Sequence, residues 1–172
     1  QGKSAIAVFR ISGDNSYEII KKISSKIPKK PNVAFFNSIM SDDKKIIDQA
    51  VTVFYKSPKS FTGQDMVEIS VHGSNAVIKK IHQTLLKQEG IRMALPGEFT
   101  RRAFENNKLD LTQVEAIADI VNAETEMQRK QAVNHLSGNF FKSTKKIFED
   151  LKRVLANIEA VIDFTEEDLP NN

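Results

Sequence analysis

The chain has 172 residues, enough for one or two domains and for a hydrophobic core that needs no disulfide or metal. The absence of cysteine excludes a disulfide framework, a thiolate nucleophile and a cysteine-ligated zinc site, and suits a reducing compartment. No apolar run approaches the roughly 18 residues of a membrane-spanning helix and no signal peptide is recognisable, so we expect a cytoplasmic protein without a membrane partner.

The charge is unevenly distributed along the chain. Residues 1–110 hold 18 Lys and Arg against 11 Asp and Glu, a balance of +7, whereas residues 111–172 hold 7 against 11, a balance of −4. This change of sign predicts a domain boundary near residue 110. A basic first domain is compatible with an anionic partner, such as nucleic acid or a polyanionic cofactor, or simply with a solvated lysine-rich surface.

Strand and helix patterns alternate irregularly in the first domain. Strands are predicted at 4–11, 33–39, 46–55, 66–72 and 91–95, and helices at 14–27, 74–89 and 96–107. Asp14 or Ser16 is expected to cap the first helix, and Pro28 to stop it. A few irregular helices among these strands favour an α+β domain with a mixed sheet over a doubly wound sheet.

The hydrophobic period changes at Asp110. Asp110 with Gln113, or Thr112 with Glu115, forms a capping box that opens a helical stretch, predicted to run to residue 136 and to be interrupted at 137–139. The following helix carries apolar residues at bundle-like spacing: Phe141, Phe148, Leu151, Leu155, Ile158 and Ile162. Because two helices cannot bury such faces alone, we expect the first helices of a larger helical domain in a longer protein.

Charged residues inside two predicted strands are the first candidates for a binding site. Arg10 and Glu68 each stand in an apolar or alternating strand, where an unpaired charge is costly. They either pair with each other or lie at a sheet edge, or they line a polar pocket in which Arg meets a carboxylate and Glu an amino-pyrimidine edge. Lys108 is either a second cation of such a pocket or a solvated lysine.

The remaining polar residues provide weaker signals. His72 ends a strand just before Gly73, a common place for a binding residue, although a single histidine is more often structural. His82 and His135 lack metal-ligand spacing, and the acidic residues 163–168 are interpreted as a solvated segment, so no metal site is predicted. No nucleophile–base set or carboxylate pair is recognisable by spacing, and no catalytic residue is assigned.

Six segments carry a family resemblance. In order they are Val8–Gly13 (VFRISG), Ser60–Ile69 (SFTGQDMVEI), Val71–Gly73 (VHG), Pro96–Phe104 (PGEFTRRAF), Asn107–Ala116 (NKLDLTQVEA) and Ile158–Phe164 (IEAVIDF). Together they closely resemble the family of tRNA-modification GTPases called MnmE or TrmE. Several long motifs in one order are far more specific than a single short pattern, and this resemblance covers almost the whole chain.

The resemblance implies an N-terminal domain, residues 1–110, of the folate-binding, aminomethyltransferase-like type, through which the protein dimerises. It implies that residues 111–172 are the first helices of a helical domain into which a GTPase domain is inserted. In this family an FAD-containing partner, MnmG or GidA, acts with the GTPase to place an aminomethyl-type group on carbon 5 of the wobble uridine of certain tRNAs. The one-carbon unit comes from a 5-formyl- or 5,10-methylene-tetrahydrofolate.

Three positions at which the family contacts folate match Arg10, Glu68 and Lys108, while the family's His-Gly-Gly is His72-Gly73-Ser74 here. The sequence holds no guanine-specificity motif and no true phosphate loop, so GTP, potassium and magnesium are expected only at a GTPase domain outside this chain. The alternative is a tRNA-binding module that uses the basic residues 1–110 without binding folate. Nucleic-acid binding of that kind weakens steeply with salt.

Overall fold

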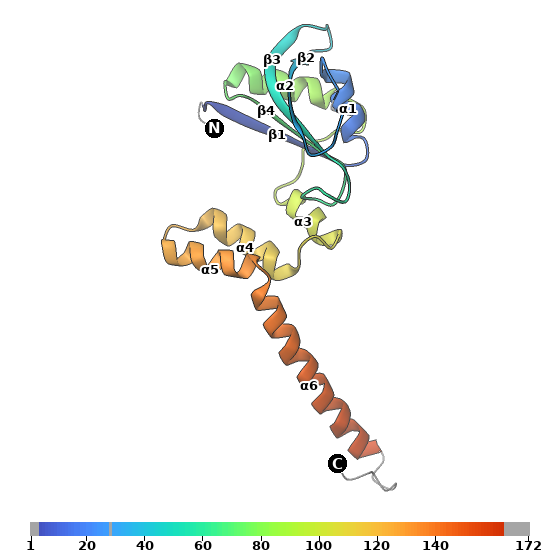
Figure 1. Cartoon of the computed structure of the whole chain (residues 1–172), viewed down its shortest axis with the longest axis vertical. Coiled ribbons are helices and arrows are strands. Elements are labelled where there is room, and N and C mark those ends of the chain that lie inside the picture. The colour runs from blue at the N-terminus through green and yellow to red at the C-terminus, as the bar shows by residue number, and fades with distance from the viewer. Residues whose placement is uncertain (1–3, 28, 164–172) are drawn as a thin grey trace. The chain divides into compact units, whose positions relative to one another are not determined.

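The computed structural model describes residues 4–27 and 29–163, and the chain divides into two compact units, Gln1–Leu109 and Asp110–Asn172 (Figure 1). The elements of the first unit are β1 (Ile6–Ser12), α1 (Ser16–Ile23), β2 (Ala34–Met40), β3 (Ile46–Tyr55), β4 (Met66–His72), α2 (Asn75–Leu86) and α3 (Glu98–Glu105). The elements of the second unit are α4 (Leu111–Asn122), α5 (Glu126–Leu136) and α6 (Asn139–Asp163).

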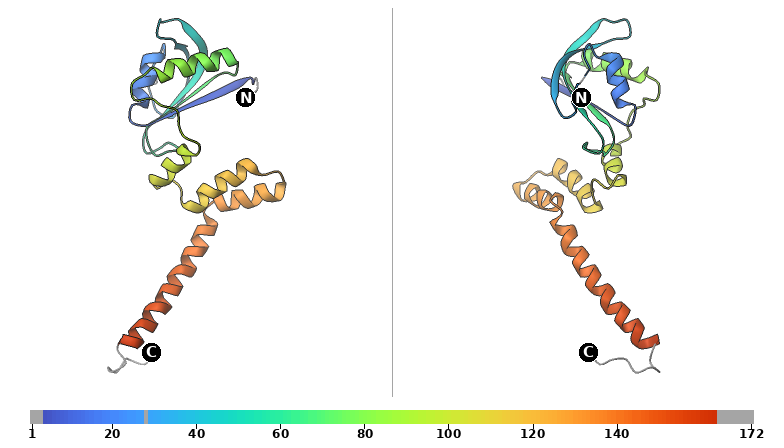
Figure 2. Two further views of the ribbon diagram at one scale, coloured as in Figure 1. Left: turned by 180° about the vertical axis from the view of Figure 1, so that it is seen from behind. Right: turned by 45° about the vertical axis from the view of Figure 1, so that its right-hand side comes forward.

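The four strands form one sheet in the order β1-β4-β3-β2. An α+β fold is confirmed, and every described strand pair is antiparallel where a mixed sheet was expected. Helices α1 and α2 cover one face of this sheet, as the views of Figure 2 show. The other face is not covered by any described helix of the same unit and is called here the open face.

Strict alternation along the strands separates the core from the open face. Val67, Ile69 and Val71 of β4 point into the core, where they pack with Ile20 of α1 and Ile81 of α2. Directly opposite residues share a face, so the open face carries Arg10 of β1 opposite Glu68 of β4. It also carries four apolar side chains that are 43% to 65% exposed: Ile6, Val8, Phe36 and Val51.

Helix α1 is shorter than the sequence predicts. Asn15 precedes it without a side-chain capping bond, instead of Asp14 or Ser16, and the helix ends at Ile23. Ser24 is extended and forms an isolated antiparallel bridge with Ile39 of β2. Pairing with β2 therefore ends the helix before Pro28, which lies outside the described residues.

The strand predicted at 91–95 is wrong. Its backbone hydrogen bonds are local: Ile91 N donates to Gln88 O at 3.2 Å, and Leu95 N donates to the Glu98 carboxylate at 2.8 Å. None of the described backbone bonds joins this segment to β1. The apolar character of the segment is explained by Ile91, which packs against the core.

The single helical stretch predicted up to residue 136 is two helices in the structure. Asp110 and Gln113 form a capping box at the start of α4, which confirms one of the two predicted alternatives. Thr125 and Gln128 form a second capping box, which begins α5. The predicted interruption after Leu136 is confirmed, with Gly138 at a φ of +77°. No helix among residues 4–27 and 29–163 is both long and apolar enough to cross a membrane.

Helix α6 exposes the apolar stripe that its spacing predicts. The side chains of Phe148, Leu151, Leu155 and Ile158 are each more than half exposed. A stripe of this length is typical of a helix that packs in a bundle. Residues 164–168 of the predicted acidic segment lie outside the described residues.

We predict that the sheet core governs the stability of the first unit. Ile69→Ala removes a fully buried side chain and should lower the free energy of unfolding by about 2–5 kcal/mol. Ile46→Ala, at a site that is 62% exposed in β3, should change it by about 0.5 kcal/mol or less. Urea unfolding followed by circular dichroism measures both values, and equal losses would be inconsistent with the described core.

Candidate functional site

The open face holds an ion pair between its two neighbouring strands β1 and β4. Arg10 Nε donates to Glu68 Oε1 at 2.6 Å, and Tyr55 Oη, from the end of β3, donates to Glu68 Oε2 at 3.1 Å. Both carboxylate oxygens of Glu68 therefore accept a hydrogen bond. The Glu68 side chain is 21% exposed and the Arg10 side chain 49%, so the pair is accessible from solvent on the arginine side.

An aromatic side chain from the β3–β4 loop, residues 56–65, approaches the same pair. The guanidinium carbon of Arg10 lies 5.9 Å from the centroid of the Phe61 ring, within the range of a cation–π contact. Burial and the negative charge of Glu68 together raise the pKa of Tyr55. The phenol consequently stays a hydrogen-bond donor to Glu68 at neutral pH.

Arg10 and Glu68 line a cleft of about 900 Å³ beside the edge strand β1. The walls come from β1, β4, α2, α3 and the segment 90–94, and His82 of α2 lies among them with its ring edge-on to Phe9 at 5.1 Å. The sequence left two interpretations of Arg10 and Glu68 open, mutual pairing and a polar pocket. In the structure both interpretations hold, because Arg10 and Glu68 pair with each other and the paired side chains border the cleft.

Lys108 does not join this pair. Its Nζ donates to Pro58 O of the β3–β4 loop at 3.1 Å, and it forms no hydrogen bond or ion pair with Arg10 or Glu68. The loop packs closely on its stem: a Cβ added at Gly63, whose φ is +78°, would lie 3.2 Å from Lys108 Cγ. Glycine is therefore required there both for its backbone angle and for the close approach.

Sequence reasoning missed two side chains that touch the pair, Tyr55 and Phe61. Phe61 stands in one of the quoted motifs, but nothing local relates it to Arg10, 51 positions earlier. Tyr55 becomes recognisable only when the register of β3 on β4 is known, since it lies opposite Met66 and diagonal to Glu68 on the open face.

His72 has a structural partner rather than a place in the cleft. Its Nδ1 lies 2.9 Å from Asp48 Oδ1, and its backbone N–H donates to Asp48 Oδ2 at 2.8 Å. Burial opposes ionisation of Asp48, but the hydrogen bonds from His72 outweigh it and lower the pKa of this carboxyl. No group of three or more His, Asp or Glu side chains that could hold a metal ion occurs in the part of the chain that the structure describes.

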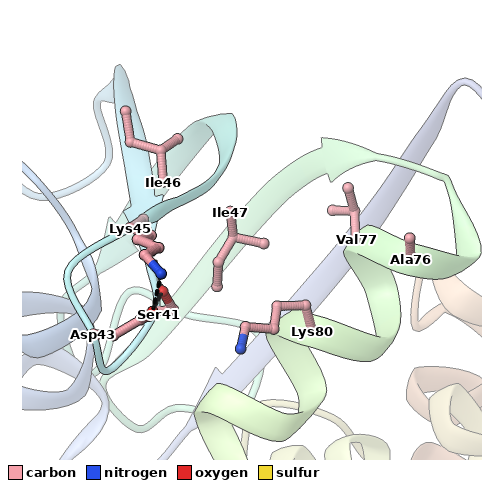
Figure 3. Close-up of a pocket in the computed structure, with 8 residues that line it drawn as sticks. All are labelled: Ser41, Asp43, Lys45, Ile46, Ile47, Ala76, Val77 and Lys80. Atoms are coloured by element: carbon pink, nitrogen blue, oxygen red, sulfur yellow. Dashed lines mark hydrogen bonds and ion pairs between the residues drawn. The ribbon is translucent and has the colours of Figure 1, made fainter.

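A second pocket, of about 450 Å³, lies between the β2–β3 turn and α2 (Figure 3). Asp43 accepts hydrogen bonds from Ser41 and Lys45, which lower its pKa to about 2. Ile47 of β3 lies between this polar turn and Val77 of α2, and the Lys80 side chain extends from α2 towards the turn. Lys80 forms no ion pair with a described residue, so the rim of the pocket is basic.

Comparison with known proteins assigns both units. Residues 1–108 match the family model of the GTP-binding protein TrmE N-terminus, and residues 111–172 match that of the MnmE helical domain. The chain is 44% identical over 172 residues to the tRNA modification GTPase MnmE of Rickettsia akari, covering 99% of this chain and 39% of that protein. It is 45% identical over 171 residues to the one of Rickettsia rickettsii (strain Sheila Smith), covering 99% and 38%. The chain thus spans about two fifths of the length of these relatives.

We predict that Glu68→Gln lowers the pKa of Tyr55 towards its ordinary value. Ionised Tyr55 is repelled by the Glu68 carboxylate, and the substitution removes that repulsion while Arg10 remains nearby. The chain has two tyrosines, so ultraviolet titration of tyrosinate in a Tyr17→Phe background reports Tyr55 alone.

Asp48→Asn is the control for this titration, because Asp48 contacts His72 and not Tyr55. It should leave the pKa of Tyr55 unchanged. An identical pKa in the Glu68→Gln variant would show that Glu68 does not act on the phenol.

Proposed function

We propose that residues 1–110 are a folate-binding and dimerisation domain, because the chain belongs to the MnmE (TrmE) family of tRNA modification GTPases. Residues 111–172 are then the first helices of the helical domain. The observation that carries the proposal is the Glu68 carboxylate, which Arg10 and Tyr55 hold on the open face, at the border of the cleft beside β1.

The chemistry of this site suits a tetrahydrofolate. The amino-pyrimidine edge of the pterin presents several N–H donors, and an ionised carboxylate offers about four lone-pair positions, of which Glu68 uses two. Arg10 and Tyr55 fix the orientation of Glu68 and leave its other lone pairs for the ligand. A volume of about 900 Å³ lies within the range of small-molecule sites.

Lys108 is proposed as a contact for an anionic part of the folate. In the ligand-free chain its ammonium group is bound to the Pro58 carbonyl, which is a neutral acceptor. A carboxylate of the glutamate tail would compete favourably for this group, because charge-assisted hydrogen bonds are stronger than neutral ones. The ligand would be a 5-formyl- or 5,10-methylene-tetrahydrofolate.

The whole protein would hydrolyse GTP and modify tRNA, as the names of the relatives state for those proteins. With an FAD-containing partner of the MnmG (GidA) type, it would place an aminomethyl-type group on carbon 5 of the wobble uridine in the cytoplasm. The GTPase domain, with its GTP, potassium and magnesium, would lie outside the residues of this chain. These residues themselves are proposed to bind folate and not to hydrolyse GTP.

The open face is the proposed dimer contact. Val8, Val51 and Phe36 lie in one row across β1, β3 and β2, with Ser70 of β4 between the first two. Single exposed apolar residues are ordinary, but a contiguous row on one sheet face is typical of an interface.

A tRNA-binding module without folate binding is the second candidate. The observation in its favour is Lys80 at the second pocket, which forms no ion pair with a described residue (Figure 3). Lys79 next to it in α2 and Lys44 in the β2–β3 turn form none with a described residue either. Such lysines suit phosphate groups. The observation is weaker than the Glu68 site, since solvated lysines are common on helix surfaces.

We predict that Glu68→Ala weakens binding of 5-formyltetrahydrofolate more than Lys108→Ala does. Removing Glu68 leaves pterin donors unpaired, at a cost of about 1–3 kcal/mol. Removing the more exposed Lys108 should cost about 1 kcal/mol or less. Isothermal titration measures both affinities. Lys59→Ala, in the β3–β4 loop that Lys108 contacts, is the control.

The same titration separates the two candidate functions. Binding of tRNA that falls steeply with salt, without any folate binding, would replace the folate proposal by the second candidate. A Glu68→Ala variant that is folded and binds folate like the wild type would reduce Glu68 to a structural ion-pair residue.

We predict that the chain is a dimer in solution and that Val51→Glu weakens dimerisation at least about tenfold, because a carboxylate would lose water within an apolar contact. Sedimentation at equal concentrations measures the effect. Met127→Glu, at a site that is 80% exposed in α5, is the matched control and should leave the mass unchanged. A wild-type chain that sediments as a monomer would refute the proposed dimer.

A further inference from the structure

The β3–β4 loop is the one described segment that touches both Arg10 and Lys108. Its Phe61 ring faces the Arg10 guanidinium, and its Pro58 carbonyl accepts the hydrogen bond from Lys108. Bonds within the loop hold its two ends together: Ser57 N and Lys56 Nζ donate to the Asp65 carboxylate at 2.8 and 2.9 Å. A displacement of this loop would therefore move two of the proposed folate contacts at once.

Several hydrogen bonds anchor the loop from outside, besides that of Lys108 and a bond of 2.9 Å from Gly13 N to Asp65 O. Thr62 Oγ1 lies 2.6 Å from Ser12 Oγ at the end of β1, and Thr62 O accepts a bond of 2.7 Å from Asn106 Nδ2, just after α3. Gln64 Oε1 accepts a bond of 2.9 Å from Arg102 Nη1 of α3. Thr62 is fully buried, so water competes least for its two bonds.

The Arg102 side chain bonds to three residues around this loop: Gln64, Ser12 and Glu98. Besides Gln64, its Nη1 reaches Ser12 O at 3.4 Å, and its Nη2 donates to Glu98 Oε1 at 2.7 Å. Its side chain is 30% exposed, whereas that of the neighbouring Arg101 is 73% exposed and bonds only Glu105. The two consecutive arginines of α3 thus have different surroundings, one towards the loop and one towards solvent.

Glu98 keeps Arg102 in place over a wide pH range. The Glu98 carboxylate accepts bonds from Arg92, from the backbone N–H of Leu95 and from Arg102, and these donors hold its pKa far below the usual range. The carboxylate therefore stays ionised well below neutral pH. The planar guanidinium of Arg102 reaches Glu98 and Gln64 together with donors in a rigid fork, whereas a lysine ammonium is a compact point charge without that geometry.

We propose that Arg102 is a positioning residue of the cleft: through Gln64 it holds the β3–β4 loop in the conformation that presents Phe61 to Arg10 and meets Lys108. The inference rests on the proposed folate site. Arg102 forms no hydrogen bond or ion pair with Arg10 or Glu68 but lines the cleft itself, whereas Gln64 is not among the lining residues, so the Gln64 variants test its action through the loop. Its action is transmitted by one hydrogen bond between side chains that are 38 positions apart in the sequence.

The test removes the hydrogen bond between Arg102 and Gln64 by changing one partner at a time. Arg102→Met keeps the aliphatic stem and loses the donors, and Gln64→Leu keeps the volume and loses the acceptor. Each should weaken binding of 5-formyltetrahydrofolate by about tenfold and speed amide hydrogen exchange in residues 56–65. Gln64→Glu restores an acceptor for Arg102 and should bind like the wild type. Arg101→Met is the matched control and should change neither quantity.

Three results would overturn the inference while the wild type binds folate. The first is an unchanged affinity for 5-formyltetrahydrofolate in Arg102→Met and Gln64→Leu. The second is a Gln64→Glu variant that binds as weakly as Gln64→Leu. The third is faster amide exchange throughout β4 and α2, which would indicate a general loss of stability. A wild-type chain that binds no folate would overturn the proposed function, and the inference with it. Measuring the wild type first keeps the two failures apart.

Discussion

The register of β1 on β4 is the constraint from which the site follows. Ile11 lies opposite Val67 and Phe9 opposite Ile69, on the face covered by α1 and α2, so Arg10 must lie opposite Glu68 on the open face. A shift by one residue would turn the apolar side chains outwards and bury both charges, which makes this register strongly preferred. The ion pair is therefore a consequence of how the core packs.

The core and the Arg10–Glu68 pair occupy opposite faces of one sheet, and the cleft beside β1 borders both, since Ile11 and Leu85 of the core also line it. β4 supplies Ile69 to the core and Glu68 to the cleft, and β1 supplies Ile11 and Arg10 in the same way. The polarity of the open face changes along its strands. Charged and phenolic groups lie beside the β3–β4 loop, and the apolar row lies further along the strands. Under the proposed function one face would serve both a ligand and a second copy of the chain.

The sequence was sufficient for features that depend on local pattern. The alternation in residues 66–72 placed Glu68 on the polar face, and the Asp110 capping box marked the beginning of α4. Features that depend on register or on distant contacts were not accessible. Ser24 leaves the helix because β2 pairs with it, and the apolar segment 91–95 packs without joining the sheet.

In the candidate site, too, the sequence predicted what depends on local pattern and missed what depends on distant contacts. The physical argument that a charge inside a strand needs a partner or a cleft led to Arg10 and Glu68, and both conditions hold. Tyr55 and Arg102 could not be found in this way, because each acts through a residue on another element. The sequence left Lys108 open as a second cation or a solvated lysine, and the family resemblance then matched it to a folate contact. In the structure it contacts the loop rather than the pair.

The central claim is that a folate binds in the cleft beside β1, at the border formed by Arg10 and Glu68. Amide chemical shifts of the chain, recorded while 5-formyltetrahydrofolate is added, test this most directly. The account predicts that the shifts that change cluster on β1, β4 and the β3–β4 loop, around Arg10, Glu68 and Phe61. Changes confined to α2 and the β2–β3 turn, or no changes at all with saturating ligand, would contradict it.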